Sequence, residues 1–219
     1  MIKFFLIILF SIVCSEPVPN QFWKHTAYKI QGSDKHYNGI DAFFNGDISD
    51  FHGKSVAIVA NHTSINTSGE NLVDLANRYL NLKVVFTPEH GLFGTKEAGE
   101  KVSGHMIGDV PVYSLYGKNK KPSKSQLDGI DVILFDMQDV GSRYYTYIST
   151  MTYVMDAAAD YNIEMIVLDR PNPLGGTIWG PTLVDGFESF VGMHHVPVSH
   201  GLTIGEFALM IKGESWLES

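Results

Sequence analysis

Four short apolar runs of this 219-residue chain each end in polar side chains, and this pattern restricts the possible folds more than any other feature. The runs cover residues 56–60, 84–86, 132–135 and 165–168. Runs of this kind are typical of strands that are buried on both faces of a parallel sheet. Because parallel strands end at one edge, where ligands bind, we expect the four polar clusters that follow to meet there.

Helical patterns separate these runs. Helices are expected over 39–45, 72–80 and 147–161, with a further helix after Thr203. Capping boxes are predicted for the second and fourth of these helices, at 67–70 and 203–206. Strand–helix alternation of this kind predicts an α/β fold with a mainly parallel sheet.

The remaining segments have weaker signals. Residues 112–115 are expected to form a short strand and 122–127 a surface helix. Two long segments rich in Gly or Pro, 91–111 and 171–199, are expected to be loops, and loops of this length are often functional.

The first fifteen residues have the pattern of a secretory signal peptide. Lys3 precedes the apolar stretch 4–13, and the residues around Cys14 resemble a cleavage site. The stretch is shorter than the roughly 20 residues of a membrane span, so we expect no stable membrane insertion. The chain is therefore expected to be exported, to the periplasm or outside the cell, with lipid attachment at Cys14 as an alternative.

The domain boundaries follow from this interpretation. Residues 16–38 are expected to be an extended lead-in and 39–219 a single folded domain. Cys14 is the one cysteine of the chain, so no internal disulfide is expected.

The charge of the chain argues against two classes of partner. The formal net charge is −8 and no basic run exists, which is unfavourable for binding nucleic acid or an anionic membrane. An anionic ligand would require local cations, and Arg143 and Arg170 follow strand ends where they could supply them.

Glu89 follows the second apolar run and Pro88, and it precedes the apolar residues Leu92 and Phe93. Apolar surroundings raise the pKa of a carboxyl group, so such a residue can act as a general acid near neutral pH. The alternative is an exposed loop carboxylate.

Asp136 and Asp139 leave three interpretations open. A phosphatase-type nucleophile is disfavoured because the two acids are three residues apart and no glycine-rich lysine loop is present. A metal site could draw on His62, His90 and His200, although no HExxH spacing exists. The third interpretation is a carboxylate pair that acts on a glycosidic bond.

Side chains near the third and fourth strand ends could bind a sugar. Arg143 offers charge-assisted hydrogen bonds, and the tyrosines Tyr144, Tyr145 and Tyr147 offer ring stacking. The alternative is that these tyrosines are core residues and that Asp169 and Arg170 pair with each other or with neighbours.

Six strings in this chain resemble the exo-β-N-acetylmuramidase family of glycoside hydrolases, which acts in peptidoglycan turnover. They are NHTS (61–64), FTPEHGLFG (86–94), VYSLYG (112–117), FDMQDVGSRYYTYISTM (135–151), LDRPNPLGG (168–176) and HGLTIGE (200–206). The resemblance implies a Rossmann-like three-layer sandwich that carries the active site at its junction with a second, C-terminal domain. Residues 39–219 are then expected to be a catalytic domain truncated at its C-terminal end.

The resemblance implies release of N-acetylmuramic acid from the non-reducing end of cell-wall saccharides. Glu89 is the expected general acid, and Asp136 or Asp139 the second carboxylate or water-orienting group. The residues expected to bind the saccharide are Asn61, His62, His90, Gln138, Arg143, Tyr145, Asp169, Arg170, Asn172 and His200. No metal or other cofactor is expected.

Two other functions remain open at this point. The chain could be a non-catalytic carbohydrate-binding remnant of such an enzyme, or a metal-dependent hydrolase. The expected protein partner is the missing C-terminal domain or a second copy of the chain in a homodimer. The carboxylate spacing that separates retaining from inverting enzymes cannot be derived from the sequence.

Overall fold

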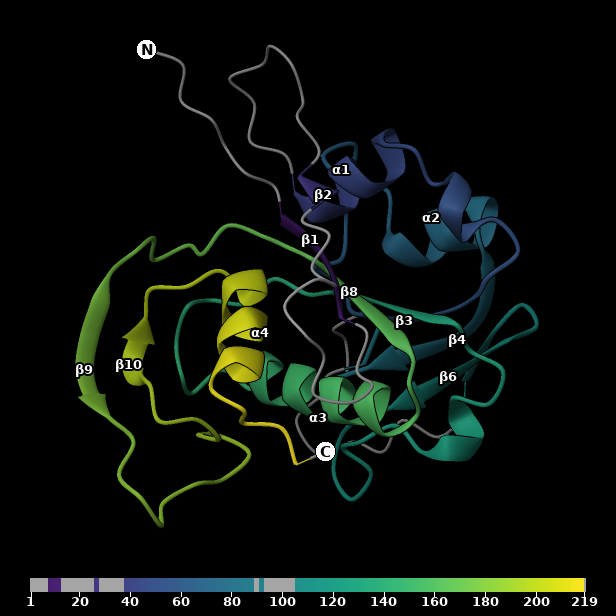
Figure 1. Cartoon of the computed structure of the whole chain (residues 1–219). Coiled ribbons are helices and arrows are strands. Elements are labelled where there is room, and N and C mark those ends of the chain that lie inside the picture. The colour runs from purple at the N-terminus through teal and green to yellow at the C-terminus, as the bar shows by residue number, and fades with distance from the viewer. Residues whose placement is uncertain (1–7, 13–25, 28–37, 89–90, 93–104, 219) are drawn as a thin grey trace, which may run out of the picture.

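The computed structural model describes residues 8–12, 26–27, 38–88, 91–92 and 105–218 of the chain (Figure 1). Its strands are β1 (Ile8–Ile12), β2 (Thr26–Ala27), β3 (Ser55–Ala60), β4 (Asn81–Thr87), β5 (His105–Ile107), β6 (Val110–Ser114), β7 (Val132–Asp136), β8 (Glu164–Leu168), β9 (Ile178–Thr182) and β10 (Pro197–His200). Its α-helices are α1 (Gly39–Asn45), α2 (Leu72–Tyr79), α3 (Tyr147–Asp160) and α4 (Ile204–Gly213), with short 3₁₀ helices at Ser49–Phe51 and Lys124–Gln126.

The central sheet has the strand order β2-β1-β8-β7-β3-β4-β6-β5 among the described residues. The ladders that join β8, β7, β3, β4 and β6 are parallel, and β1 and β5 are antiparallel to their neighbours. The mainly parallel sheet expected from the sequence is therefore confirmed.

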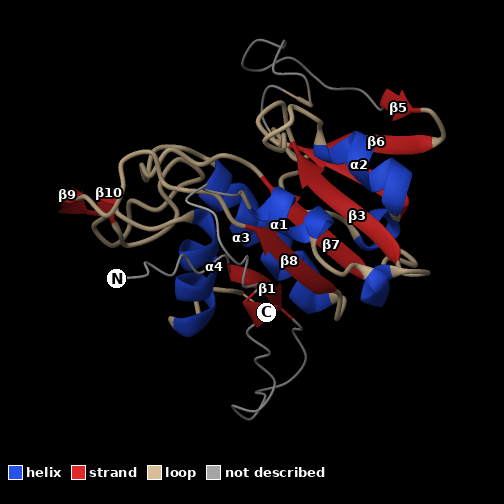
Figure 2. Ribbon diagram, turned by 90° about the horizontal axis from the view of Figure 1, so that it is seen from above, coloured by secondary structure: helices blue, strands red, loops and turns tan. Residues whose placement is uncertain are grey.

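Helices cover both faces of this sheet (Figure 2). One apolar cluster joins alternate strand residues such as Ala57 and Phe86 to α3 and α4, and the other joins Ile58 and Val85 to α1 and α2. The strand residues are buried on both sides because each face packs against its own helix layer. The expected three-layer sandwich is thus confirmed.

The capping boxes that we expected have different outcomes. Thr203 caps α4, since its hydroxyl accepts from Glu206 N and the Glu206 side chain accepts from Thr203 N. The box expected at 67–70 is wrong, because α2 begins later and Asn71 caps it. Thr67 instead donates through its backbone N (3.0 Å) and its hydroxyl (2.7 Å) to the buried Asp41 carboxylate.

Two expectations for the connecting segments are also corrected. The segment 122–127 contains a single 3₁₀ turn, not an α-helix. The segment expected to be a loop over 171–199 contains the antiparallel hairpin β9–β10. All five residues of β9 are exposed, and its sequence includes Gly180 and Pro181, which are uncommon in strands.

The N-terminal segment is described only in part. Residues 8–12 form β1 beside β8, whereas the rest of the expected signal peptide lies outside the described residues. Of the expected lead-in 16–38, β2 and Asn38 are described. No helix in the described part of the chain is long and apolar enough to cross a membrane.

Candidate active site

The carboxyl ends of β3, β4, β7 and β8 lie at one edge of the sheet because these strands are parallel. The chain runs from β3 to β4 and β6, and later returns to β7 on the other side of β3. Such a topological switch point leaves a crevice where ligands bind in open α/β sheets. The loops after β3 and β7 therefore form the centre of the candidate site.

Asn61 holds the loop after β3 in place. Its Nδ2 donates to the hydroxyl of Tyr147 (2.7 Å), and its Oδ1 accepts from the backbone N (2.8 Å) and hydroxyl (2.6 Å) of Thr63. Its backbone N donates to the hydroxyl of Ser64, which donates to the carbonyl oxygen of Asp136. Asn61 is buried, so this geometry favours a structural role over the saccharide contact that we expected.

Asp136 and Arg170 bind each other at neighbouring strand ends. Two guanidinium nitrogens of Arg170 donate to the two carboxylate oxygens of Asp136, and Arg170 also donates to the carbonyl oxygen of Ile65. Burial raises the pKa of Asp136, and Arg170 opposes that shift. Because the pair is fully buried and internally satisfied, its geometry favours a structural role over catalysis or binding of the lactyl group.

Asp169 and Asn172 anchor the start of α4. Asp169 accepts from Gly205 N (2.7 Å) and from the Thr203 hydroxyl (2.7 Å), and burial raises its pKa despite these donors. Asn172 donates to the carbonyl oxygen of Leu202 (2.9 Å). The sequence predicted the correct edge for both residues, but their contacts are with the protein.

Arg143 joins the loop after β7 to the β9–β10 hairpin. Its Nη1 donates to the carbonyl oxygens of Pro181 (2.9 Å) and Val196 (2.5 Å), and its backbone N donates to Val198 O (2.8 Å). Arg143 is buried, and its Nε has no hydrogen-bond partner among the described residues. The expected anion-binding arginine is thus positioned as a support for the hairpin.

Asp139 and His200 form a second buried pair. The Nε2 atom of His200 lies 3.4 Å from Oδ2 of Asp139, and that oxygen also accepts from Gly141 N (2.7 Å). In the described part of the chain, Oδ1 of Asp139 and Nε2 of His200 make no hydrogen bond of good geometry. Oδ1 of Asp139 can therefore accept a further hydrogen bond, whereas both carboxylate oxygens of Asp136 already accept from Arg170.

Three of the expected saccharide-binding residues face solvent. His62 is exposed after β3, and Tyr145 is 39% exposed and packs edge-on against Tyr147 (4.7 Å between ring centroids). Gln138 is half-buried, and its Nε2 donates to the carbonyl oxygens of Asp139 and Pro171. His62 belongs to the loop after β3. Tyr145 lies close to this loop because it packs against Tyr147, which bonds Asn61.

Glu89 and His90 lie outside the described residues, so their predicted roles remain predictions. The flanking residues are described: Thr87 ends β4 at the same edge of the sheet, and Gly91 N donates to Pro88 O (3.2 Å). Gly91 has φ +69°, a left-handed conformation that favours glycine.

The set of expected saccharide-binding residues lacked Thr63, Ser64 and Tyr147, which also lie at this edge. All three belong to the strings that carry the family resemblance, which was the available signal. Their hydroxyl groups take part in the hydrogen bonds that fix the loops after β3 and β7, including Gln138 N to Thr63 Oγ1 (3.0 Å).

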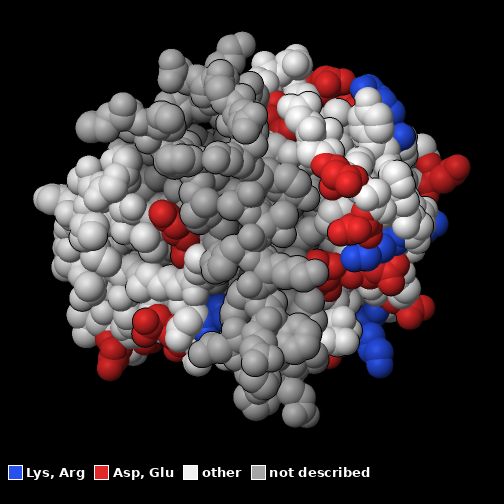
Figure 3. All heavy atoms as spheres, turned by 45° about the horizontal axis from the view of Figure 1, so that its top comes forward, with Lys and Arg blue, Asp and Glu red and all other residues white. Residues whose placement is uncertain are grey.

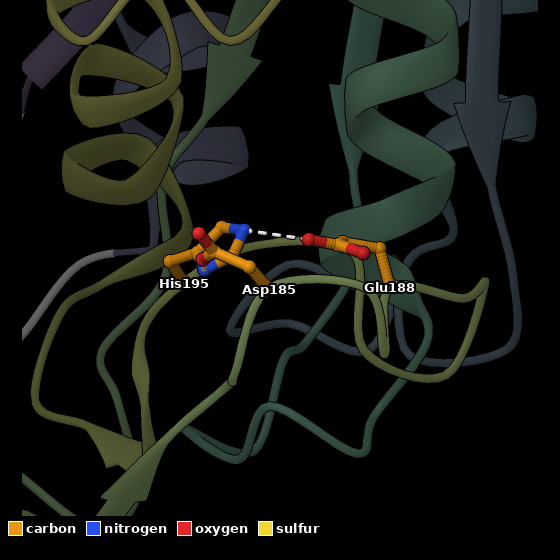
Figure 4. A group of neighbouring side chains, drawn as sticks. All are labelled: Asp185, Glu188 and His195. Atoms are coloured by element: carbon orange, nitrogen blue, oxygen red, sulfur yellow. Dashed lines mark ion pairs between the residues drawn. The ribbon is translucent and has the colours of Figure 1, made fainter.

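A group of exposed metal-ligating residues lies elsewhere, in the connection between β9 and β10. His195 contacts Asp185 through Nδ1 (3.3 Å) and Glu188 through Nε2 (2.9 Å) (Figure 4). Both ring nitrogens face carboxylates, so the arrangement is that of a histidine between two acids. It includes none of the histidines that the sequence suggested as ligands.

A shallow hollow of about 390 Å³ occurs at the opposite edge of the sheet. It is lined by residues that precede β7 and β8, among them Leu127 and Tyr161.

On the face drawn in Figure 3, basic side chains of the described residues form no continuous area, while acidic ones are spread over the surface.

Comparison with known proteins identifies relatives of this chain. The family model described as "Exo-beta-N-acetylmuramidase NamZ, N-terminal" matches residues 56–219. The chain is 44% identical over 181 residues to a Bacillus subtilis (strain 168) protein named peptidoglycan beta-N-acetylmuramidase NamZ, covering 80% of this chain and 44% of that protein.

Solved structures give the same result for the fold. Two crystal structures of DUF1343 family proteins from Bacteroides fragilis match with TM-scores of 0.75 and 0.70, at 41% and 35% identity. Each match covers 84% of this chain and 47% or 49% of the other, so the chain spans about half the length of its relatives. The resemblance read from the six strings is confirmed, and the chain belongs to the exo-β-N-acetylmuramidase NamZ family.

Proposed function

We propose that this chain carries the catalytic edge of a glycoside hydrolase that releases N-acetylmuramic acid from the non-reducing end of peptidoglycan fragments. The observation that carries this proposal is the 44% identity to a peptidoglycan β-N-acetylmuramidase across the segments that build the switch point. The chain spans less than half of that relative, so the activity of this chain by itself is part of the proposal.

The proposed chemistry uses two carboxyl groups. Glu89 protonates the glycosidic oxygen, and Asp139 orients the attacking water or serves as the second carboxylate. Asp139 is a better candidate than Asp136, because Oδ1 of Asp139 is unpaired among the described residues whereas both oxygens of Asp136 accept from Arg170. Since Oδ1 of Asp139 is buried, a water molecule is the smallest donor that can supply its missing hydrogen bond.

The proposed saccharide contacts are the solvent-facing side chains of this edge. Tyr145 offers part of an aromatic ring for stacking on a sugar, and His62 and Gln138 offer hydrogen bonds beside it. The buried Asn61 bonds Tyr147, against which Tyr145 packs, and the buried Arg170 donates to Ile65 O in the loop that contains His62.

Turnover of a chromogenic N-acetylmuramic acid glycoside tests this proposal. Glu89→Gln and Asp139→Asn should each reduce kcat by about 100-fold or more, within the range for removal of an acid–base group. Glu188→Gln, which changes an exposed acid in the β9–β10 connection, is the matched control and should retain full activity. Equal activity of Glu89→Gln and the parent would contradict the proposed role of Glu89.

The second candidate function is saccharide binding without turnover, which is favoured by the chain's coverage of under half of its relatives. Calorimetric binding of a muramic-acid saccharide, with no release of the chromophore, would identify a binding module. Loss of activity on adding a chelator would instead indicate a metal-dependent hydrolase.

We also propose that the chain is exported, since residues 1–15 have the pattern of a signal peptide. Mass spectrometry of the mature protein distinguishes the outcomes. A new N-terminus near residue 16 supports cleavage, and a lipid on Cys14 supports the lipoprotein alternative. An intact Met1 N-terminus on cytoplasmic protein would contradict export.

A further inference from the structure

His200 and Asp139 come from distant parts of the chain and meet at the carboxyl edge. Asp139 follows β7, and His200 is the last residue of β10. Each residue is 4% exposed, and 3.4 Å separates Nε2 of His200 from Oδ2 of Asp139. Both side chains are therefore covered by the protein, and the His200 ring faces Asp139 and not solvent.

The hydrogen bonds of His200 determine which ring nitrogen carries the proton. The backbone N of Leu202 donates to Nδ1 (3.3 Å), so Nδ1 is an acceptor. In a neutral imidazole the other nitrogen then carries the hydrogen, and that nitrogen is Nε2, which faces Asp139. The contact is long and imperfectly aligned, as is common for functional hydrogen bonds in the absence of substrate.

The backbone of Gly141 links the two residues. Gly141 N donates to Oδ2 of Asp139 (2.7 Å), and Gly141 O accepts from the backbone N of His200 (3.2 Å). Gly141 has φ +78°, and the Asn172 side chain fills the space where a Cβ would lie. The contacts among Gly141, Asp139 and His200 therefore hold the loop after β7 against β10.

These contacts act on one oxygen of Asp139 and leave the other free. Oδ2 faces Gly141 N and His200 Nε2, whereas Oδ1 is buried and accepts no hydrogen bond among the described residues. The ring of His200 is itself fixed edge-on against Phe207 (4.9 Å between centroids). A carboxylate oriented in this way presents a defined lone pair to whatever donor reaches Oδ1.

We propose that His200 is a positioning residue that orients the Asp139 carboxylate, so that Oδ1 accepts from the water molecule of the reaction. The inference rests on the proposed function for its catalytic consequence, and on the geometry of the pair for its structural part. His200 acts through Asp139 and makes no contact with the saccharide.

Two substitutions of His200 test the catalytic consequence. His200→Phe removes the N–H that faces Asp139, and kcat should fall by about 100-fold while KM stays within about twofold, since misplacing a reacting group lowers the rate to this extent. His200→Gln supplies an amide N–H of similar reach and should recover most of the loss. In the background of Asp139→Asn, His200→Phe should have little further effect.

His194→Phe is the matched control. His194 is also buried and its ring lies 5.5 Å from the same Phe207 ring, but its side chain bonds Thr152 and not Asp139. It should reduce thermal stability while kcat is retained. If His200→Phe and His194→Phe lower kcat equally, or if His200→Gln gives no recovery, the positioning role is refuted.

Nuclear magnetic resonance tests the pair without any turnover. Nitrogen-15 spectra of the whole chain should show His200 with its hydrogen on Nε2, and the carboxyl carbon of Asp139 should shift in His200→Phe but not in His194→Phe. A hydrogen on Nδ1, or an unchanged Asp139 resonance, would overturn the inference. Absent turnover of the parent chain with these NMR results would reject the proposed function alone.

Discussion

Arg170 donates two hydrogen bonds to Asp136 at neighbouring strand ends, from Nε to Oδ1 (2.5 Å) and from Nη2 to Oδ2 (2.9 Å). The two side chains are 4% and 0% exposed. Nη2 also donates to the carbonyl oxygen of Ile65 (3.0 Å), in the loop after β3. One ion pair thus connects the ends of β7 and β8 with the loop that contains His62.

Removing one partner of this pair should destabilise the fold strongly. Arg170→Met leaves the Asp136 carboxylate buried without its cation, and the free energy of unfolding should fall by about 3–5 kcal/mol. Urea unfolding followed by circular dichroism measures this change. The double variant Asp136→Leu/Arg170→Met should lose less than the sum of the single changes, because no unpaired charge is left.

Lys54 and Glu164 provide the comparison for that measurement. They form an ion pair at 3.0 Å, but their side chains are 37% and 23% exposed. Solvent screens such a pair, so Lys54→Met should change the free energy of unfolding by less than about 1 kcal/mol. A similar loss for Lys54→Met and Arg170→Met would show that burial does not govern the stability contributed by Asp136 and Arg170.

Gly205 in α4 has no room for a side chain. A Cβ there would lie 2.7 Å from Cγ of Asp169, whose Oδ1 accepts from Gly205 N. Gly205→Ala should therefore displace Asp169 and lower the free energy of unfolding by about 1–3 kcal/mol, as overpacking does.

Gly213 of the same helix is the control, since a Cβ there meets no atom of the described residues within 4 Å. Gly213→Ala should be neutral or stabilise the protein by up to about 1 kcal/mol, because alanine favours helix. Thermal melts of the two variants should move in different directions. Equal melting temperatures would contradict the close approach of α4 to Asp169.

The sequence predicted the sheet and most helices because apolar periodicity directly reflects burial. The face of α3 that contains Ile148, Met151 and Met155 is fully buried, as its spacing predicted. The cap of α2 was wrongly predicted because Thr67 bonds Asp41, a partner 26 residues away that local spacing does not reveal. The hairpin was missed because β9 lacks apolar–polar alternation.

The sequence also predicted which residues reach the carboxyl edge, but not which of them are free to act there. Asp136, Arg143 and Arg170 have side chains suited to catalysis or anion binding, yet each is buried and hydrogen-bonds to the protein itself. The residue type and its position at the end of a strand predict that a side chain lies at the carboxyl edge of the sheet. Only three-dimensional contacts distinguish a saturated carboxylate such as Asp136 from Asp139, whose Oδ1 lacks a partner among the described residues.

The two helix caps should differ in the stability that they contribute. Asn71 accepts one hydrogen bond, from Val73 N (2.9 Å), and Asn71→Ala should cost about 1 kcal/mol. Thr203 accepts from Glu206 N and also donates to Asp169 Oδ2 (2.7 Å). Thr203→Ala should therefore cost more, about 2 kcal/mol, because it also removes a donor from a buried carboxylate.

Thr203→Ser is the control for this comparison, because serine keeps the hydroxyl that makes both contacts. Its free energy of unfolding should remain within about 0.5 kcal/mol of the parent. Chemical denaturation of the three variants measures these differences. The proposed link between α4 and Asp169 would be rejected if Thr203→Ala were no more destabilising than Asn71→Ala.

His194 should make the stability of the fold depend on pH. It is 3% exposed, stacks on Trp216 (4.8 Å between centroids), and its Nε2 lies 2.8 Å from Thr152 Oγ1. Burial, with a smaller contribution from His195, lowers the pKa of His194 from 6.5 to about 4. Below pH 6.5 the unfolded chain therefore binds a proton that the folded chain does not.

The lower proton affinity of His194 in the folded chain means that acid destabilises the fold through this residue. The stability associated with neutral His194 is fully present above pH 6.5 and falls as the pH decreases toward 4, by about 1.4 kcal/mol per pH unit. The raised pKa values of Asp136 and Asp169 act in the opposite direction, so the total slope is a sum of several groups. Comparison with His194→Gln isolates the histidine, because glutamine does not titrate.

Urea unfolding at several values between pH 7 and pH 4 measures the two slopes. The parent should lose more stability than His194→Gln over this range, whatever the difference in absolute stability between them. Parallel curves for the parent and His194→Gln would mean that the proton affinity of His194 is the same in the folded and unfolded chains, contrary to its burial against Trp216.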